Sequence, residues 1–222
     1  MRIVVAGAHG QIAQHLGRRL AARGDEVVGL VRDPAHVGDL DRLGVRASVR
    51  DLETSGVAAV AGDLAGADAV VFAAGAGPGS GTDRKDSVDR AAAVLLADAA
   101  QAAGVRRYVL VSSMGVDLVR DGATPAGVDE VFVAYLRAKL AAEDDVLARD
   151  ALDVSVLRPG ALTDEEPTGR VELARSVGRG SVPRADVADV LVALLDRPGD
   201  GEVLELVAGP QPVADAVAAA RR

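Results

Sequence analysis

The sequence predicts one α/β domain built on a doubly wound parallel sheet with helices on both faces. Short runs of Val, Leu and Ala alternate with longer segments of helical periodicity along the 222 residues. Strands and helices in that order form right-handed crossovers and a parallel sheet that is covered on both sides. The first apolar run also ends in a glycine-rich turn. Because no fixed-period repeat and no linker divides the chain, we expect residues 1–222 to form a single domain.

The individual elements follow from apolar runs and from the residues that end helices. The short apolar runs have the length of buried parallel strands. Ile12, Leu16 and Leu20 share one helical stripe that ends at Gly24, and a second long helix ends at Gly104. The expected strands span 3–6, 27–31, 45–49, 69–74, 108–111, 154–157 and 203–207. The later expected helices span 86–103, 128–149 and 184–195, and a glycine-rich loop spans 75–81.

Charge and composition exclude several classes of function. The formal net charge is −8 and only 2% of the residues are aromatic, whereas nucleic-acid binding needs a basic face and stacking rings. There is no cysteine, and the three histidines lack the spacing of a helical metal site, so we expect no metal centre. The sequence has neither a signal peptide nor a membrane-spanning run, so we expect a soluble cytoplasmic protein. We also expect it to be a monomer or a homodimer and to act on a small molecule.

The turn after the first strand reads Gly-Ala-His-Gly-Gln-Ile-Ala over residues 7–13. Such a loop lets backbone amides approach a pyrophosphate, which then lies at the positive end of the following helix. Gly7 would form the tight turn, and Gly10 would let the backbone approach the pyrophosphate closely. Ala13 would let the helix pack closely on the strand. His9 either touches the phosphates or lies at the mouth of the site. The position of this loop directly after the first strand predicts a dinucleotide site of the Rossmann type.

The residue at the end of the second strand bears on the choice of dinucleotide. NAD sites usually place an acidic residue there to bind the ribose hydroxyls. This chain has Arg32, followed by Asp33. Because a guanidinium can bind a 2′-phosphate through charge-assisted hydrogen bonds, we expect NADP rather than NAD.

Tyr135 and Lys139 are four residues apart in a chain that has only two tyrosines and two lysines. Residues at this spacing lie on one face of a helix, so both side chains can enter one cleft. An ammonium places a compact positive charge beside a phenol, which a wide planar guanidinium does not do in the same way. An ammonium in such a cleft would lower the pKa of the phenol, and the alternative is a buried tyrosine beside a solvated lysine. Ser112 and Ser113 follow directly after the fifth expected strand.

Taken together, these segments resemble the short-chain dehydrogenase/reductase superfamily. The likeness is closer to its atypical branch of small NAD(P)-binding proteins, described as NAD-dependent epimerase/dehydratase-like. It extends in family order over nearly the whole chain. The residues that carry it are 7–13, 31–34, Asp51-Leu52, 73–75, 111–115, 135–139, 157–160 and 184–188.

The resemblance implies roles for individual residues. Tyr135 would be the general acid in carbonyl reduction, and Ser113, with Ser112 as the alternative, would hydrogen-bond the substrate oxygen. Lys139 would bind the nicotinamide ribose. The implied cofactor-binding residues are Gly7, His9, Gly10, Gln11, Ile12, Arg32, Asp51, Leu52, Ala74, Gly75, Lys139, Pro159, Gly160 and Leu162.

The leading hypothesis is an NADPH-dependent oxidoreductase that acts on a small carbonyl compound or another hydride acceptor. The alternatives are a nucleotide-sugar epimerase or dehydratase and a redox-sensing regulator that binds NADP without chemistry. Epimerases usually carry a larger C-terminal substrate domain, and only 162–183 and 198–222 remain to build a small substrate-binding lobe. We expect the substrate pocket to be formed by 75–81, 114–128 and 162–180.

Overall fold

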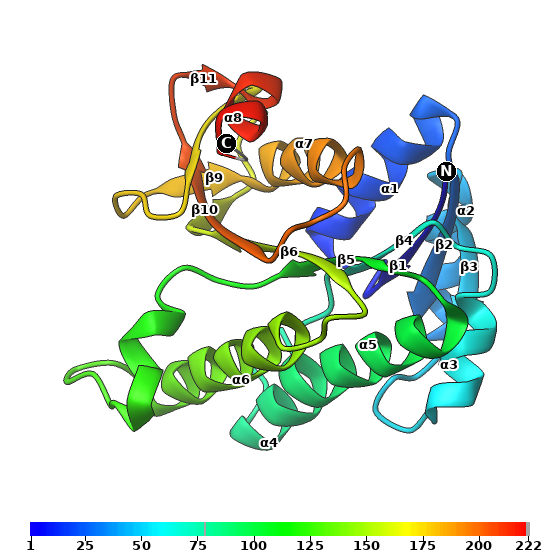
Figure 1. The fold of residues 1–222 in the computed structure, drawn as a ribbon, viewed down its shortest axis with the longest axis horizontal. Coiled ribbons are helices and arrows are strands. Elements are labelled where there is room, and N and C mark those ends of the chain that lie inside the picture. Colours follow the sequence, from blue (N-terminus) through cyan, green and yellow to red (C-terminus); the bar gives the residue numbers. More distant parts are fainter. Residues whose placement is uncertain (78, 221–222) are drawn as a thin grey trace.

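A nine-stranded sheet forms the centre of the molecule, with helices on both faces (Figure 1). The computed structural model describes residues 1–77 and 79–220, so Pro78 of the expected 75–81 loop and residues 221–222 lie outside the described chain. The strands are β1 (Arg2–Ala6), β2 (Glu26–Val31), β3 (Arg46–Val49), β4 (Ala69–Phe72), β5 (Arg107–Val111), β6 (Asp153–Pro159), β7 (Ala161–Thr163), β8 (Arg170–Ala174), β9 (Ser181–Pro183), β10 (Glu202–Ala208) and β11 (Gln211–Pro212). The helices are α1 (Gln11–Arg23), η1 (Pro34–His36), α2 (Val37–Arg42), α3 (Val57–Asp63), α4 (Thr82–Arg84), η2 (Lys85–Ala91), α5 (Ala92–Ala103), η3 (Val116–Gly122), α6 (Glu130–Leu147), α7 (Arg184–Leu195) and α8 (Val213–Ala220).

The sheet is mostly parallel, which confirms the predicted fold class. Its order is β11-β8-β10-β6-β5-β4-β1-β2-β3, and every pair from β10 to β3 is parallel. One edge departs from the expectation, because β8 pairs antiparallel with both β10 and β11. In β8, Val171 and Leu173 are buried while their neighbours face outward. The 162–183 segment therefore contributes a strand to the main sheet.

The strand order reverses direction between β1 and β4. From β1 the chain proceeds outward to β2 and β3, then crosses back so that β4 pairs with the other side of β1. In open parallel sheets, ligands bind beyond the carboxyl ends of the strands at such a switch point. The 7–13 turn and the segment after β4 both lie at this position.

Two hydrophobic layers hold the helices against the sheet. One layer contains residues from α1, α7 and α8, and the other contains residues from α3, α5 and α6. Figure 1 shows these two groups on opposite sides of the strands. The core is aliphatic, as the composition indicates, and its largest fully buried side chain is that of Tyr108. The carboxyl edge between the two layers stays available for a ligand.

The helix expected at 86–103 is longer than its apolar pattern indicates. It begins at Thr82 and passes through η2, a stretch of π-helix, before it continues as α5. It ends at Gly104, which adopts the left-handed conformation with φ 73°. The boundary differs because the first two turns carry charged residues that give no apolar stripe. Short stretches of π-helix inside α-helices are frequent at functional sites.

The helix that carries Tyr135 and Lys139 begins where a side chain caps it. Asp129 accepts hydrogen bonds from the amides of Val131 and Phe132 at 3.0 and 3.1 Å, which stabilises the first turn of α6.

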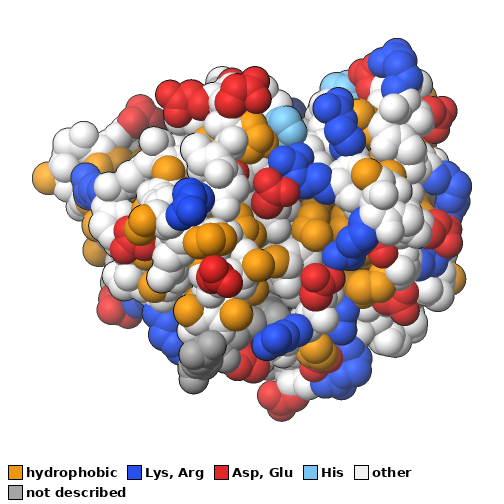
Figure 2. All heavy atoms as spheres, turned by 90° about the horizontal axis from the view of Figure 1, so that it is seen from above, with side chains coloured by type: hydrophobic (Ala, Val, Ile, Leu, Met, Phe, Trp, Pro, Cys, Tyr) orange, Lys and Arg blue, Asp and Glu red, His pale blue; other side chains and the backbone are white. Residues whose placement is uncertain are grey.

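Charges of both signs are interspersed on the face that Figure 2 shows, which lies on the side of α1, α7 and α8. Hydrophobic side chains lie singly or in small groups between them. Within the described chain, no helix is long and apolar enough to span a bilayer.

Candidate active site

Two adjoining cavities of about 400 and 560 Å³ lie at the switch point. They share Gly10 and the segment Ala73-Ala74-Gly75, which follows β4. The first cavity extends toward the ends of β2 and β3, and the second toward the ends of β5 and β6. An elongated ligand can therefore occupy both cavities and pass over the 7–13 turn.

The 7–13 turn has the geometry of a phosphate-binding loop, and we call its backbone around Gly7 the cradle. Gly7 has φ +76°, and a Cβ atom added there would lie 2.5 Å from the Cα of Ala74. Gly10 is the N-cap of α1, and no side chain caps this helix. The amides of its first turn are thus available to an anion at the positive end of the helix. Gln11 and Ile12 line the second cavity, so these residues fit a dinucleotide pyrophosphate.

Replacement of Gly7 by alanine is expected to destabilise the fold by about 1–3 kcal/mol and to abolish dinucleotide binding, because strain and a backbone clash combine there. Gly24→Ala is the matched control, since Gly24 has φ +90° but open space where the added methyl group would lie. Thermal unfolding and titration with NADPH measure the two effects. Equal losses of binding in both variants would contradict the role of Gly7 in the cradle.

Two arginines and a glutamate lie at the outer end of the first cavity. Arg32 and Arg84 each donate to Oε2 of Glu53 at 2.9 Å, and Ser87 donates to Oε1 at 2.7 Å. The hydrogen bond from Ser87 and the charges of Arg84 and Arg32 hold the pKa of Glu53 below its ordinary value, although burial alone would raise it. Glu53 is therefore anionic at neutral pH, and both guanidiniums have a counter-charge.

Asp51 and Leu52, which the resemblance places beside an adenine, line the same cavity. Oδ1 of Asp51 accepts a hydrogen bond from the amide of Glu53 at 3.0 Å, which holds the turn after β3. Leu52 packs partly against the hydrophobic layer that contains α3 and α5. The turn thus presents an apolar side chain and a fixed backbone to the cavity.

His9 lies at the mouth of the first cavity. Its ring stacks on that of His36, with centroids 3.5 Å apart and planes 4° apart. Nε2 of His9 also hydrogen-bonds Oδ2 of Asp39 at 2.9 Å. This bond and one from Arg42 hold the pKa of Asp39 below its ordinary value. The contacts of His9 link the turn after β1 to the segment after β2.

The second cavity brings together the residues that were predicted to act on the substrate. Ser112, Ser113, Tyr135 and Lys139 all line it, although they come from the end of β5 and from α6. Tyr135 is half-buried. The other tyrosine, Tyr108, is fully buried in the core and donates to the carbonyl of Ala93 at 2.9 Å. Of the two tyrosines, Tyr135 therefore lines the second cavity and Tyr108 does not.

Lys139 is held by a cage of acceptors. Its Nζ lies 3.2 Å from Oδ1 of Asp89 and donates to the carbonyls of Val111 at 3.1 Å and Ala74 at 3.4 Å. Asp89 is fully buried, and its Oδ2 accepts from the amide of Ala76 at 3.2 Å. Buried charges are normally paired in this way. The ammonium therefore joins the ends of β4 and β5 to η2, and it lies 5.9 Å from the centroid of the Tyr135 ring.

The two serines differ in their surroundings. Oγ of Ser113 donates to the carbonyl of Met114 at 3.1 Å, and the residue is half-buried. Oγ of Ser112 is buried and has no hydrogen-bond partner in the described chain. Because a hydroxyl rotates freely about its C–O bond, Ser113 can turn its donor toward a ligand in the cavity.

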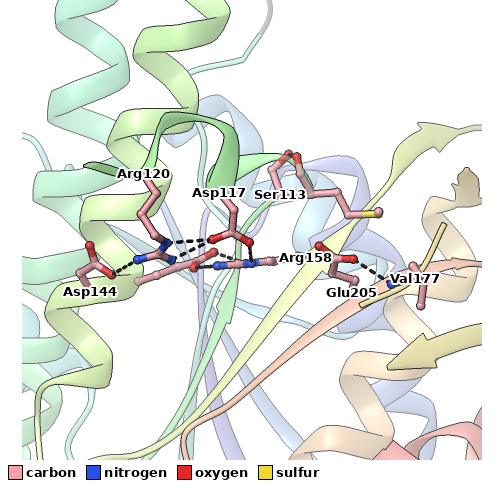
Figure 3. A network of polar contacts seen from close by, with 9 residues as sticks. Ser113, Asp117, Arg120, Asp144, Arg158, Val177 and Glu205 are labelled. Carbon is pink, nitrogen blue, oxygen red and sulfur yellow. Dashed lines mark hydrogen bonds and ion pairs between the residues drawn. The ribbon is translucent and has the colours of Figure 1, made fainter. Parts of the chain in front are cut away.

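Arg158 connects three segments that line or flank the second cavity (Figure 3). Its guanidinium contacts Glu143 of α6 at 2.5 Å and Asp117 of η3 at 2.6 Å, and Arg120 contacts the same aspartate at 2.8 Å. Burial alone would lower the pKa of Arg158, but Glu143 and Asp117 raise it above its ordinary value. Likewise, burial would raise the pKa of Asp117, but Arg120 and Arg158 hold it below its ordinary value. This network folds the connection between Ser113 and Tyr135 back against the sheet.

The composition of the cavity wall differs in part from the expectation. Pro159, Gly160 and Leu162, which the resemblance implies as cofactor-binding residues, line the second cavity. Within the described chain, however, no residue of 114–128 lines it, and Leu162 alone represents 162–180. The first turns of α6 replace them, with Asp129, Val131 and Phe132. The assignment of 162–183 and 198–222 to a substrate-binding lobe stays a prediction.

Sequence reasoning missed Lys85 and Asp89, which face the second cavity from η2. The scarcity of lysine was a usable signal for Lys85, because this chain has only two. Among the described residues, no group of three His, Asp or Glu side chains is arranged to hold a metal ion.

Comparison with known proteins places these features in a family. The model of a family described as NAD(P)H-binding matches residues 7–198. An uncharacterized sugar epimerase of Bacillus subtilis, YhfK, is 31% identical over 219 residues, which cover 98% of this chain and 99% of that protein. A solved structure described as "Putative NAD-dependent epimerase/dehydratase from Bacillus halodurans" is 33% identical with a TM-score of 0.87, and the match covers 99% of both chains. The oxidoreductase ylbE of Lactococcus lactis is 27% identical with a TM-score of 0.83, over 99% of this chain and 96% of that one.

Proposed function

This chain belongs to the NAD(P)H-binding family, and on that premise we propose that it is an oxidoreductase that transfers a hydride between NADPH and a small carbonyl compound. The observation that carries the proposal is the convergence of Ser113, Tyr135 and Lys139 on one cavity. That cavity adjoins the uncapped N-terminus of α1 and the cradle at Gly7. A dinucleotide bound over the 7–13 turn can therefore extend toward the phenol.

The chain's own residues supply the proton and the positioning. A bound nicotinamide would supply the hydride to the carbonyl carbon. The carbonyl oxygen then gains negative charge and needs a proton as the new C–H bond forms. Tyr135 is the donor in this proposal, Ser113 donates a hydrogen bond to the same oxygen, and Lys139 contributes positive charge beside the phenol.

A dinucleotide titration followed by NADPH oxidation assays tests the function. NADPH should bind to the purified protein, and at least one compound in a panel of aldehydes, ketones and quinones should accelerate its oxidation. Binding without oxidation by any compound, together with a stable protein partner, would instead support the regulator that senses NADP.

Arg32 supports NADP as the preferred dinucleotide. It lies beside Arg84 at the outer end of the first cavity, and its side chain is 56% exposed. The 2′-phosphate of NADP carries charge that two guanidiniums can bind, although it must compete with Glu53 for them.

Replacement of Arg32 by alanine is expected to weaken NADPH binding about tenfold, because one charge-assisted hydrogen bond to phosphate is lost. NADH binding should stay nearly unchanged, since NADH has no 2′-phosphate. Arg46→Ala is the control, because Arg46 is an exposed arginine on β3 that does not line either cavity. Equal weakening of NADPH and NADH by Arg32→Ala would contradict the assignment.

A nucleotide-sugar epimerase is the second candidate, and the name of the Bacillus subtilis relative favours it. Such an enzyme retains its dinucleotide through the catalytic cycle. Purified protein that keeps NAD through gel filtration, with no net oxidation of NADPH by carbonyl compounds, would support the epimerase over the reductase.

A further inference from the structure

The two lysines of this chain both face the second cavity, on either side of one tyrosine. Nζ of Lys85 lies 5.3 Å from the centroid of the Tyr135 ring, and Nζ of Lys139 lies 5.9 Å from it. Both residues are buried, with exposures of 8% and 4%. The fold thus brings the ammonium groups of both lysines of this chain into one cavity.

The two ammoniums differ in their counter-charges. Lys139 is paired with the buried carboxylate of Asp89 and donates to two carbonyls. Lys85 donates to the carbonyl of Gly77 at 2.8 Å. Among the side chains that the structure describes, no carboxylate forms an ion pair with its Nζ. Among the described side chains that line this cavity, Lys85 is therefore the cation without an ion-pair partner.

A buried ammonium without a counter-charge is costly, because it has lost water and gained no opposite charge. An ammonium has three donors, and the carbonyl of Gly77 uses one of them. Since Lys85 lines the cavity, an anion that enters the cavity can take the remaining donors. Binding of such an anion would offset the free energy that the desolvation of Lys85 costs the folded protein.

The rim of the same cavity is apolar. Val131, Phe132 and Leu162 line it and are 36%, 46% and 37% exposed. They are three of the six large hydrophobic side chains that the described chain leaves exposed. The ring of Phe132 lies 5.7 Å from that of Tyr135, with an interplanar angle of 29°. Exposed apolar side chains gathered at a cavity indicate a ligand with an apolar body.

We propose that Lys85 is a subsite for a carboxylate of the substrate, and that the substrate is an apolar or aromatic carbonyl compound carrying such a group. This inference rests on the proposed reductase function and names its class of substrate. The dinucleotide pyrophosphate is another source of negative charge. The uncapped amides of α1 and the cradle at Gly7 already serve it, and Lys85 lines the cavity that contains Tyr135 but not the first cavity.

A matched pair of probes tests the subsite by equilibrium binding. Phenylglyoxylate has an aromatic body, a ketone and a carboxylate, and its methyl ester keeps the first two but carries a neutral ester in place of the carboxylate. Each is titrated calorimetrically into protein saturated with NADP⁺, which does not reduce it. The protein should bind the acid about tenfold more tightly than the ester, as one charge-assisted hydrogen bond implies.

Lys85→Met should remove this preference, and so should Lys85→Gln, which can still donate to Gly77. Arg184→Met is the control, since Arg184 also lines the cavity but is already paired with Asp164 at 2.7 Å. This variant should keep the preference for the acid. Melting temperatures and NADP⁺ affinities of all variants establish that they are folded and loaded.

Several results would overturn the subsite. These are equal affinities for acid and ester in the unaltered protein, binding of neither probe, or a preference that survives both Lys85 variants. Lys85 variants that weaken NADP⁺ as much as the acid would assign the ammonium to the cofactor phosphates instead. Failure of NADPH to bind at all refutes the proposed function, whereas normal NADPH binding without a preference for the acid refutes only this inference.

Discussion

Replacement of Tyr135 by phenylalanine is expected to lower the rate of NADPH oxidation by about 10²–10⁴-fold, the usual contribution of a positioned proton donor. In the proposed mechanism, the phenol donates a proton to the carbonyl oxygen beside the dinucleotide. Phenylalanine keeps the ring and its contact with Phe132 but removes the donor. NADPH affinity should change little, because the substitution leaves the cradle at Gly7 and Arg32 unaltered. Steady-state rates and NADPH titrations measure the two effects separately.

Tyr108→Phe is the matched control for this substitution. It removes the hydroxyl that donates to Ala93 in the core, so it should lower stability slightly and leave the rate per folded molecule unchanged. An unchanged rate in Tyr135→Phe would show that another group supplies the proton. A rate loss that accompanies an equal loss of NADPH affinity would indicate a structural role for Tyr135.

Replacement of Arg158 by methionine is expected to lower the free energy of unfolding by about 3–5 kcal/mol. The change leaves the carboxylate of Glu143 buried, at 1% exposure, without its counter-charge. It also removes the contact between Asp117 of η3 and β6, whereas Arg120 still pairs with Asp117 and with Asp144 of α6. Urea denaturation measures the stability. The catalytic rate should fall as well, since the same network holds the chain between Ser113 and Tyr135.

Two further variants compare the stability contribution of the buried pair of Arg158 and Glu143 with that of an exposed ion pair. Arg106→Met breaks an ion pair with Asp153 in which the arginine side chain is 59% exposed, so its cost should stay below about 1 kcal/mol. The double variant Arg158→Met with Glu143→Met should regain much of the lost stability, because no unpaired buried charge remains. A cost for Arg158→Met as small as that for Arg106→Met would contradict the proposed role of this network.

The central fold could be predicted well because most of its parallel strands are continuous apolar runs. Gly24 and Gly104 end their helices in the left-handed conformation that glycine favours, so these boundaries were readable too. The edge of the sheet that the C-terminal part of the chain forms could not be predicted in the same way. β8 alternates buried and exposed residues over only five positions, and its antiparallel pairing depends on β10, which lies about thirty residues further along the chain. Short strands of this kind are specified by tertiary contacts.

The site was predicted in part for a similar reason. Tyr135 and Lys139 were found because their spacing on one helix is local information. Asp89 and Lys85 were missed because charged residues on a helix normally face solvent, and nothing in the sequence indicates that η2 turns them inward. Asp89, the partner of Lys139, lies 50 residues before it in the chain. That contact exists only once β4, β5 and η2 have assembled.

The π-helical stretch at 85–91 has a consequence for how the cavity tolerates changes in chain length. In a π-helical stretch the backbone hydrogen bonds join residues five apart instead of four, so its side chains point in directions that a regular α-helix would not give them. Because α5 is fixed by its packing on α3, a deletion that restored regular α-helical winding would change the direction of Lys85 inside this stretch. The π-helical winding thus sets the direction from which this ammonium enters the cavity. Insertions and deletions at 86–91 should therefore be far less acceptable than substitutions at the exposed positions among them.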